Sequence, residues 1–233
     1  MSAYQVLMTK KIAPALVQKA KQQDVNIEEM EFVEIVPCEE KDRVREVAEK
    51  PALVAFTSKN AVNIVAGLLG KTKPSWKIFC IDGATRTRAE HCFGAPSIAG
   101  TAINARQLGA VIAGDNTAKK EVVFFCGDKR RDDLPHILDH EDIDVEEITV
   151  YETRLSPEEI GRHFDGIAFF SPSAVESFFS VNVIDDRTVF YAIGDTTSEC
   201  LKKFAPNRVI TCPKASEEDM VDTILGSIKN TNE

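Results

Sequence analysis

The sequence predicts an α/β fold made of two similar domains, each a parallel sheet flanked by helices. Three observations lead to this prediction: short apolar runs recur along the chain, segments of helical period separate them, and parts of the chain resemble each other. Apolar runs of this kind, alternating with helices of about ten residues, are typical of parallel sheets that are covered on both faces. The 233 residues suffice for one large domain or two small ones.

The individual elements follow from these patterns in order. Apolar runs predict strands at residues 4–9, 31–37, 52–57, 77–81, 121–126, 148–153, 166–171, 188–193 and 208–211. Helical periodicity predicts helices near 13–23, 41–48, 59–69, 85–93, 103–113, 130–139, 173–180, 196–204 and 216–228. Gly70-Lys71-Thr72 looks like the end of a phosphate-binding loop, but Val65 stands where that loop requires glycine. We therefore interpret Gly70 as the end of the helix at 59–69.

Segments of the two halves match at nearly equal offsets. Residues 54–62 read VAFTSKNAV and residues 167–175 read IAFFSPSAV, while residues 79–94 match residues 190–205 with Gly83 against Gly194. A chance likeness between two strand–helix units is the alternative, but two matches together indicate a duplicated domain. Residues 6–18 also resemble residues 123–137, which places the N-terminal segment with the C-terminal half.

This pairing predicts the domain boundaries. We expect a discontinuous domain one at residues 1–35 plus 153–233, and an inserted domain two at residues 36–152. The crossing segments, about 31–38 and 148–154, have β character. We expect them to lie side by side as a two-stranded hinge about which the domains open and close.

The charge balance excludes one class of function and leaves another open. Lys and Arg number 28 against 37 Asp and Glu, a formal net charge of −9. A protein that grips nucleic acid binds the phosphates through clustered Lys and Arg, so we expect no nucleic-acid partner. Apolar stretches fall short of the roughly 18 residues of a membrane span, and the start lacks a secretory segment, so we expect a cytoplasmic protein without a membrane partner.

Motifs for metal or cofactor chemistry are missing. The six cysteines have no metal or redox spacing, and Cys80, Cys126, Cys200 and Cys212 adjoin apolar runs, where we expect small core residues. His136 and His140 are four apart but lack the adjacent Glu of a zinc-binding helix. There is no GxGxxG and no GxSxG. We therefore expect neither a metal nor a cofactor.

Small residues and basic residues follow the predicted strands. Ser58, Ser171, Gly83 and Gly194 are predicted at carboxyl ends of parallel strands, where open α/β sheets bind ligands beside helix N-termini. The alternative is that they merely cap helices. Basic residues also follow strands, with acidic residues mostly elsewhere: Lys10, Lys11, Lys59, Arg86, Arg88, Lys129, Arg130 and Arg131. This pattern predicts a basic cleft mouth and a ligand with several carboxylates or phosphates, although ordinary solvated charges are the alternative for each residue.

Four motifs give the chain a family resemblance. AFTSKNAV, VYETR, FFSPSAVESF and AIGDTTSECL together resemble uroporphyrinogen-III synthases, and the resemblance extends over the whole chain. It implies two α/β domains joined by a two-stranded β ladder. It also implies a cofactor-independent hydro-lyase that closes linear hydroxymethylbilane to uroporphyrinogen III, with inversion of ring D and loss of water, in tetrapyrrole (haem) biosynthesis. That substrate carries acetate and propionate carboxylates on every pyrrole.

The resemblance also implies the site residues. The tyrosine of VYETR is Tyr151, our candidate for assisting the loss of water, and its alternative is an aromatic packed between strands. Arg86 and Lys10 stand where the family commonly has Thr and Arg, respectively. The candidate substrate-binding residues are Thr9, Lys10, Ser58, Asn60, Gly83, Thr85, Arg86, Gly127, Arg130, Ser171, Ser173, Gly194, Thr196 and Thr197.

Two other functions remain open at this stage. One is a non-catalytic two-domain protein that binds an anionic metabolite, and the other is an enzyme acting on nucleotides, which the missing phosphate loop disfavours. We expect a monomer that makes a transient contact with the preceding pathway enzyme.

Overall fold

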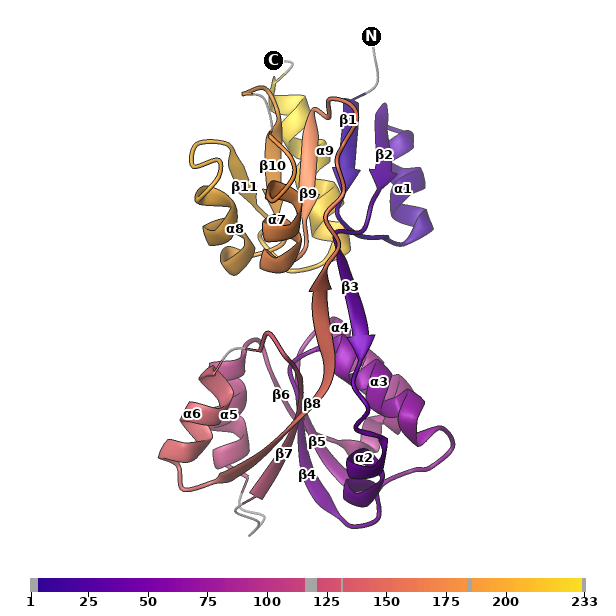
Figure 1. Cartoon of the computed structure of the whole chain (residues 1–233), viewed down its shortest axis with the longest axis vertical. Coiled ribbons are helices and arrows are strands. Elements are labelled where there is room, and N and C mark those ends of the chain that lie inside the picture. The colour runs from indigo at the N-terminus through magenta and orange to yellow at the C-terminus, as the bar shows by residue number, and fades with distance from the viewer. Residues whose placement is uncertain (1–3, 116–120, 131, 184–185, 232–233) are drawn as a thin grey trace. The chain divides into compact units, whose positions relative to one another are not determined.

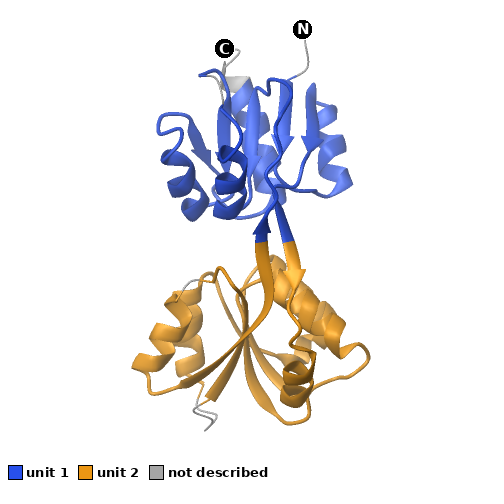
Figure 2. Ribbon diagram, in the orientation of Figure 1, with its two compact units in different colours: residues 1–34, 154–233 blue, residues 35–153 orange. Residues whose placement is uncertain are grey.

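The chain divides into two compact units. The computed structural model describes residues 4–115, 121–130, 132–183 and 186–231. Unit 1 consists of residues 1–34 and 154–233, and unit 2 consists of residues 35–153 (Figure 2). The chain passes between the units within strands β3 (Val33–Pro37) and β8 (Asp144–Leu155). The domain boundaries expected from the sequence, 1–35 plus 153–233 and 36–152, stay a prediction.

Unit 1 holds a five-stranded parallel sheet in the order β11-β10-β9-β1-β2 (Figure 1). Its strands are β1 (Tyr4–Met8), β2 (Val25–Glu29), β9 (Gly166–Phe169), β10 (Val189–Ala192) and β11 (Val209–Thr211). Its helices are α1 (Pro14–Lys21), α7 (Pro172–Phe179), α8 (Asp195–Lys202) and α9 (Glu217–Thr231).

Unit 2 holds a six-stranded sheet in the order β3-β8-β7-β4-β5-β6. Five strands are parallel neighbours, and Figure 1 shows β3 running opposite to its neighbour β8. The remaining strands are β4 (Ala52–Phe56), β5 (Trp76–Ile81), β6 (Ile98–Ala102) and β7 (Glu121–Gly127). The helices are α2 (Lys41–Ala48), α3 (Lys59–Leu69), α4 (Ala84–Phe93), α5 (Ala105–Ala113), α6 (Asp133–His140) and the short 3-10 helix Ala95–Ser97.

The two sheets share one strand order. Strands β6-β5-β4-β7-β8 of unit 2 correspond to β11-β10-β9-β1-β2 of unit 1. The correspondence places β4 against β9 and β5 against β10, as the matches between residues 54–62 and 167–175 and between 79–94 and 190–205 predict. The prediction of two similar α/β units is confirmed.

Helices cover both faces of each sheet, which explains why the strands are so apolar. In unit 2 one face packs against α2, α3 and α4, and the other packs against α5 and α6. In unit 1 one face packs against α1 and α9, and the other packs against α7 and α8. A strand covered on both sides buries every side chain, so it reads as a continuous apolar run.

Two strands were missed in the prediction. Strand β2 has the sequence VNIEE, and β6 has the sequence IAGTA. Both are edge strands of the parallel part of their sheet and have few branched apolar residues. Gly100 in β6 is needed for close packing, since an added Cβ would lie 2.7 Å from Val111 Cγ1 and 2.9 Å from Phe79 Cδ1. A glycine required for packing lowers the apparent strand propensity of the segment.

Other expectations agree closely with the structure. Helices α2 and α3 have the predicted bounds, and Gly70 is the C-cap of α3. The strand expected at 31–37 begins at Val33, and the one expected at 148–153 extends over Asp144–Leu155. Within the described residues, no helix is both long and apolar enough to cross a membrane.

Candidate active site

The predicted site residues gather at one edge of each sheet. In unit 2, Ser58 follows β4, Gly83 follows β5, Gly127 ends β7 and Tyr151 lies on β8. Because β4, β5, β7 and β8 are parallel, their carboxyl ends meet at the same edge. The candidates Thr9, Ser171 and Gly194 likewise follow β1, β9 and β10 of unit 1.

Ser58 is the N-cap of helix α3. Its backbone is extended, with φ −137° and ψ 133°, and its Oγ accepts a hydrogen bond of 3.1 Å from the backbone N–H of Asn60. A serine at this position provides an acceptor for an N–H group that the first turn of the helix leaves without a partner. Asn60, which we expected at the site, therefore contributes its backbone N–H to the cap.

Tyr151 reaches the same serine oxygen from strand β8. Its hydroxyl donates a hydrogen bond of 3.0 Å to Ser58 Oγ, although the two residues are 93 positions apart. The side chain is 9% exposed. Burial raises the pKa of the Tyr151 phenol. The phenol therefore stays protonated at neutral pH and acts as a hydrogen-bond donor.

Gly127 makes room for the tyrosine ring. A Cβ added at this position would lie 2.4 Å from Tyr151 Cζ and 2.8 Å from its hydroxyl oxygen. A register shift between Cys126 and Gly127 places Gly127 opposite Tyr151 in the sheet. The Asp128 N–H donates to the Tyr151 carbonyl at 3.0 Å, and Asp128 Oδ1 accepts from the Thr153 N–H at 2.8 Å. The backbone on both strands thus holds the ring in place.

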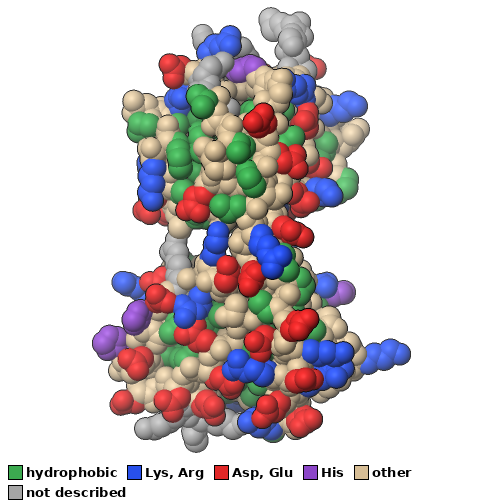
Figure 3. All heavy atoms as spheres, in the orientation of Figure 1, with side chains coloured by type: hydrophobic (Ala, Val, Ile, Leu, Met, Phe, Trp, Pro, Cys, Tyr) green, Lys and Arg blue, Asp and Glu red, His purple; other side chains and the backbone are tan. Residues whose placement is uncertain are grey.

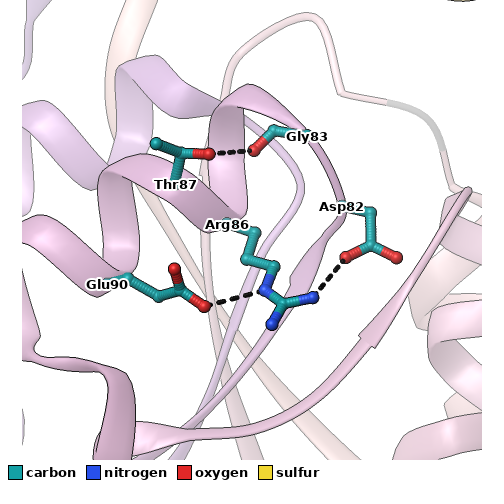
Figure 4. Close-up of polar contacts among 5 residues, drawn as sticks. All are labelled: Asp82, Gly83, Arg86, Thr87 and Glu90. Atoms are coloured by element: carbon teal, nitrogen blue, oxygen red, sulfur yellow. Dashed lines mark hydrogen bonds and ion pairs between the residues drawn. The ribbon is translucent and has the colours of Figure 1, made fainter.

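Arg86 lies in a cluster of charged residues at the start of α4 (Figure 4). Its Nε donates to Glu90 Oε1 at 2.8 Å, and its Nη1 lies 3.4 Å from Asp82 Oδ1. The hydrogen bond to Glu90 raises the pKa of Arg86, so the guanidinium remains charged. Thr87 Oγ1 donates to the Gly83 carbonyl at 3.0 Å, while Thr85 is buried.

Arg130 is also held by acidic residues. It forms ion pairs with Asp132 and Glu147. Lys10 in unit 1 pairs with Glu217 at 2.5 Å and lies 4.8 Å from the centre of the Phe170 ring. Arg131, another expected member of the basic set, lies outside the described residues.

These pairs correct the expectation that acidic residues lie mostly away from the strand ends. That expectation is wrong for Asp82, Asp132, Glu147 and Glu217, each of which pairs with a candidate cation. On the face of unit 2 that Figure 3 shows, acidic and basic side chains are interspersed. A signal for the two ion pairs of Arg86 was visible in the sequence, since Asp82, Arg86 and Glu90 follow one another at spacings of four.

The candidates of unit 1 are arranged differently. Thr9 is buried, and its hydroxyl donates to the Ala168 carbonyl at 2.9 Å. Ser171 caps helix α7, its Oγ accepting from the Ala174 N–H at 3.2 Å, and Ser173 is half-buried in the first turn of that helix.

Helix α8 carries the last three candidates. Gly194 is its N-cap, and within its first turn Thr196 is exposed while Thr197 is only 3% exposed. The burial of Thr197 is compatible with a packing role for its side chain. Contact between any of these residues and a substrate stays a prediction.

Four cysteines lie in the cores of the two units. Cys80, Cys126, Cys200 and Cys212 are buried, as the sequence predicts, and burial raises the pKa of the Cys80 thiol to about 11. Within the described parts of the chain, no three His, Cys, Asp or Glu side chains are grouped so that they could hold a metal ion.

One protein-family model matches most of the chain. A model described as uroporphyrinogen-III synthase HemD matches residues 14–222, well over half of the chain. The chain belongs to this family. The resemblance of the four sequence motifs to uroporphyrinogen-III synthases is thereby confirmed.

Uroporphyrinogen-III synthases of solved structure share the fold. The uroporphyrinogen-III synthetase of Helicobacter pylori is 17% identical, with a TM-score of 0.64, over 96% of this chain and 99% of that one. A mutant uroporphyrinogen III synthase of the extremely thermophilic bacterium Thermus thermophilus is 14% identical, with a TM-score of 0.67, over 99% of both chains. No curated protein sequence matches the chain. At these identities the structural likeness shows the fold.

Proposed function

We propose that this chain is a uroporphyrinogen-III synthase, which closes linear hydroxymethylbilane to uroporphyrinogen III with inversion of ring D and loss of water. The single observation that carries the proposal is the match of the family model to residues 14–222. The reaction belongs to tetrapyrrole biosynthesis and makes the chain a cyclising hydro-lyase.

The chemistry requires little of the protein beyond positioning. Loss of the terminal hydroxyl gives an azafulvene, which the electron-rich pyrroles of the same molecule attack. The protein must hold ring D so that its substituted carbon attacks first, giving a spiro intermediate. Fixing one geometry among several lowers the entropic part of the barrier, and no covalent nucleophile is needed.

The strand ends of each unit offer groups for this task. Carboxylates of the substrate can accept hydrogen bonds from backbone N–H groups and from the hydroxyls of Ser171, Ser173 and Thr196. Lys10, Arg86 and Arg130 supply positive charge, although each already pairs with an acidic residue. We therefore assign the carboxylates of the substrate to a mixture of hydroxyl, backbone and shared cationic donors.

Tyr151 assists the loss of water as a protonated hydroxyl whose hydrogen bond is donated to Ser58. Its burial and raised pKa favour the protonated phenol, which suits a donor and not a base. We further propose that the reaction needs no cofactor, that the chain is a cytoplasmic monomer, and that it meets the preceding pathway enzyme transiently to receive an unstable substrate.

The test is a product analysis. The chain is incubated with freshly generated hydroxymethylbilane, and the type I and type III cyclic products are separated. We expect type III product in an amount that rises with protein concentration. Formation of type I product alone would favour a non-catalytic protein that binds an anionic metabolite.

A further inference from the structure

The hydrogen bonds of Ser58 with Asn60 and Tyr151 use its oxygen as an acceptor and leave its own proton for another partner. A serine hydroxyl has two acceptor positions and one donor. Ser58 Oγ accepts from the Asn60 N–H at 3.1 Å and from the Tyr151 hydroxyl at 3.0 Å. Both acceptor positions are occupied, and the described residues contain no acceptor for the remaining O–H. The Ser58 proton is therefore available at the carboxyl edge of the sheet.

Tyr151 is placed in the opposite way. Its ring packs over Gly127, its hydroxyl proton is used in the bond to Ser58, and only 9% of the residue is exposed. Ser58, by contrast, is half-buried and stands at the strand end before helix α3. Of the two hydroxyls, that of Ser58 is the better placed to meet a molecule from solution.

We propose that Ser58 is the hydroxyl that contacts the departing oxygen of the substrate, and that Tyr151 is a positioning residue that acts through Ser58. This inference rests on the proposed function. Tyr151 orients the Ser58 hydroxyl by occupying one of its acceptor positions, and a donor that is already oriented needs no rearrangement when negative charge develops on the leaving oxygen.

The step balances without ionisation of either residue. The C–O bond of the terminal hydroxymethyl group breaks with its electron pair on oxygen, and Ser58 donates a hydrogen bond to that oxygen. The N–H proton of the terminal pyrrole moves to the same oxygen, which gives water and the neutral azafulvene. Tyr151 keeps its proton throughout, in agreement with the upward shift that burial gives its pKa.

Steady-state kinetics of the full chain with fresh hydroxymethylbilane test the inference. We expect Ser58→Ala to lower kcat for type III product by about 100-fold, in the range found when one oriented donor is removed, with KM changed less than about threefold. Ser58→Thr keeps the hydroxyl and should restore most of kcat. Tyr151→Phe should lower kcat by about 10-fold, since Ser58 remains but is less well oriented.

The decisive measurement is the kcat of the double variant that carries both Ser58→Ala and Tyr151→Phe. If Tyr151 acts through Ser58, Tyr151→Phe lowers kcat less than about twofold further in the Ser58→Ala background. An equal effect of Tyr151→Phe in both backgrounds, or an unchanged kcat in Ser58→Ala, would overturn the inference. A wild-type chain that makes no type III product would overturn the proposed function itself, so the two failures are distinguishable.

A matched control separates chemistry from helix capping. Asn104 caps helix α5 of the same unit, its Oδ1 accepting from the Gln107 N–H at 2.9 Å. We expect Asn104→Ala to lose a comparable cap and to keep kcat within about twofold, and a loss as large as that of Ser58→Ala would overturn the inference. If Ser58→Ala does not fold, Ser58→Gly provides the same test, because glycine is an accepted N-cap.

Discussion

Ser58 and Ser171 occupy equivalent positions in the two units but have different surroundings. Each follows a central strand of its sheet and caps the next helix. A tyrosine hydroxyl bonds to Ser58. None of the three tyrosine hydroxyls of the chain, all in described residues, has a bond to Ser171. Tyr4 donates to the Asp165 carbonyl, Tyr191 bonds to Ser227, and Tyr151 bonds to Ser58. The cap shared by both units is explained by folding, while the extra hydroxyl in unit 2 calls for a functional explanation.

Gly83 and Gly194 also occupy equivalent positions but differ in backbone conformation. Both precede the first residue of an equivalent helix, and the sequence matches them to each other. Gly83 has φ +83°, a conformation that favours glycine, whereas Gly194 is extended at φ −179°, which any residue can adopt. The glycine is thus required by the backbone in unit 2 only, and its presence in unit 1 has no conformational cause.

The largest expected effect tests the equivalence of the two cores. Phe56 and Phe169 correspond in the repeat, and both are fully buried. We expect Phe56→Ala and Phe169→Ala each to lower the free energy of unfolding of its unit by about 3–5 kcal/mol, because each leaves a cavity. Urea unfolding followed by circular dichroism measures this. A loss below about 1 kcal/mol in one of them would show that the two cores are not equivalent.

A smaller effect is expected where the units differ in packing. The Cβ of Gly127→Ala would overlap the Tyr151 ring, so we expect a loss of about 1–3 kcal/mol in the free energy of unfolding. Gly194→Ala is the matched control, since nothing lies within 4 Å of the added Cβ. In a Tyr151→Ala background most of the Gly127→Ala cost should disappear. An undiminished cost there would contradict the assigned contact.

The smallest effect isolates the Tyr151 hydrogen bond. Ser171→Ala should cost about 1 kcal/mol of unfolding free energy through the lost cap. Ser58→Ala should cost about 1 kcal/mol more, because it also leaves the buried Tyr151 hydroxyl without its acceptor. In a Tyr151→Phe background the two serine substitutions should cost the same. A difference that persists in that background would place its origin elsewhere.

Much of the fold could be predicted because it depends on local patterns. Helical periodicity predicted the bounds of α2 and α3, and the internal repeat predicted the strand order that the two sheets share. Strands β2 and β6 lacked such a pattern. The sequence also did not predict which residues of β1 and β7 correspond. The match of residues 6–18 with 123–137 sets Val6 against Val123. In the structure Leu7 pairs with Ile167 as Val123 pairs with Val54, so Leu7 is the residue that corresponds to Val123. This shift by one residue exchanges the two faces of the strand.

The candidate site could be predicted only as a set of strand ends. The types and positions of Ser58, Gly127 and Tyr151 were expected, but their contact joins residues from three strands and depends on the register shift beside Gly127. The contacts of Glu147 with Arg130 and of Glu217 with Lys10 are likewise set by tertiary packing, since Glu217 is 207 residues from Lys10. Only the Asp82, Arg86 and Glu90 group lay within reach of a local rule.

The central claim is that this chain directs ring closure to the type III isomer. The most direct measurement is the rate of type III formation from freshly generated hydroxymethylbilane at several protein concentrations, beside the spontaneous closure without protein. We predict a rate proportional to protein concentration and a type III product that displaces the type I product. Type I product alone, at a rate independent of the protein, would contradict the account.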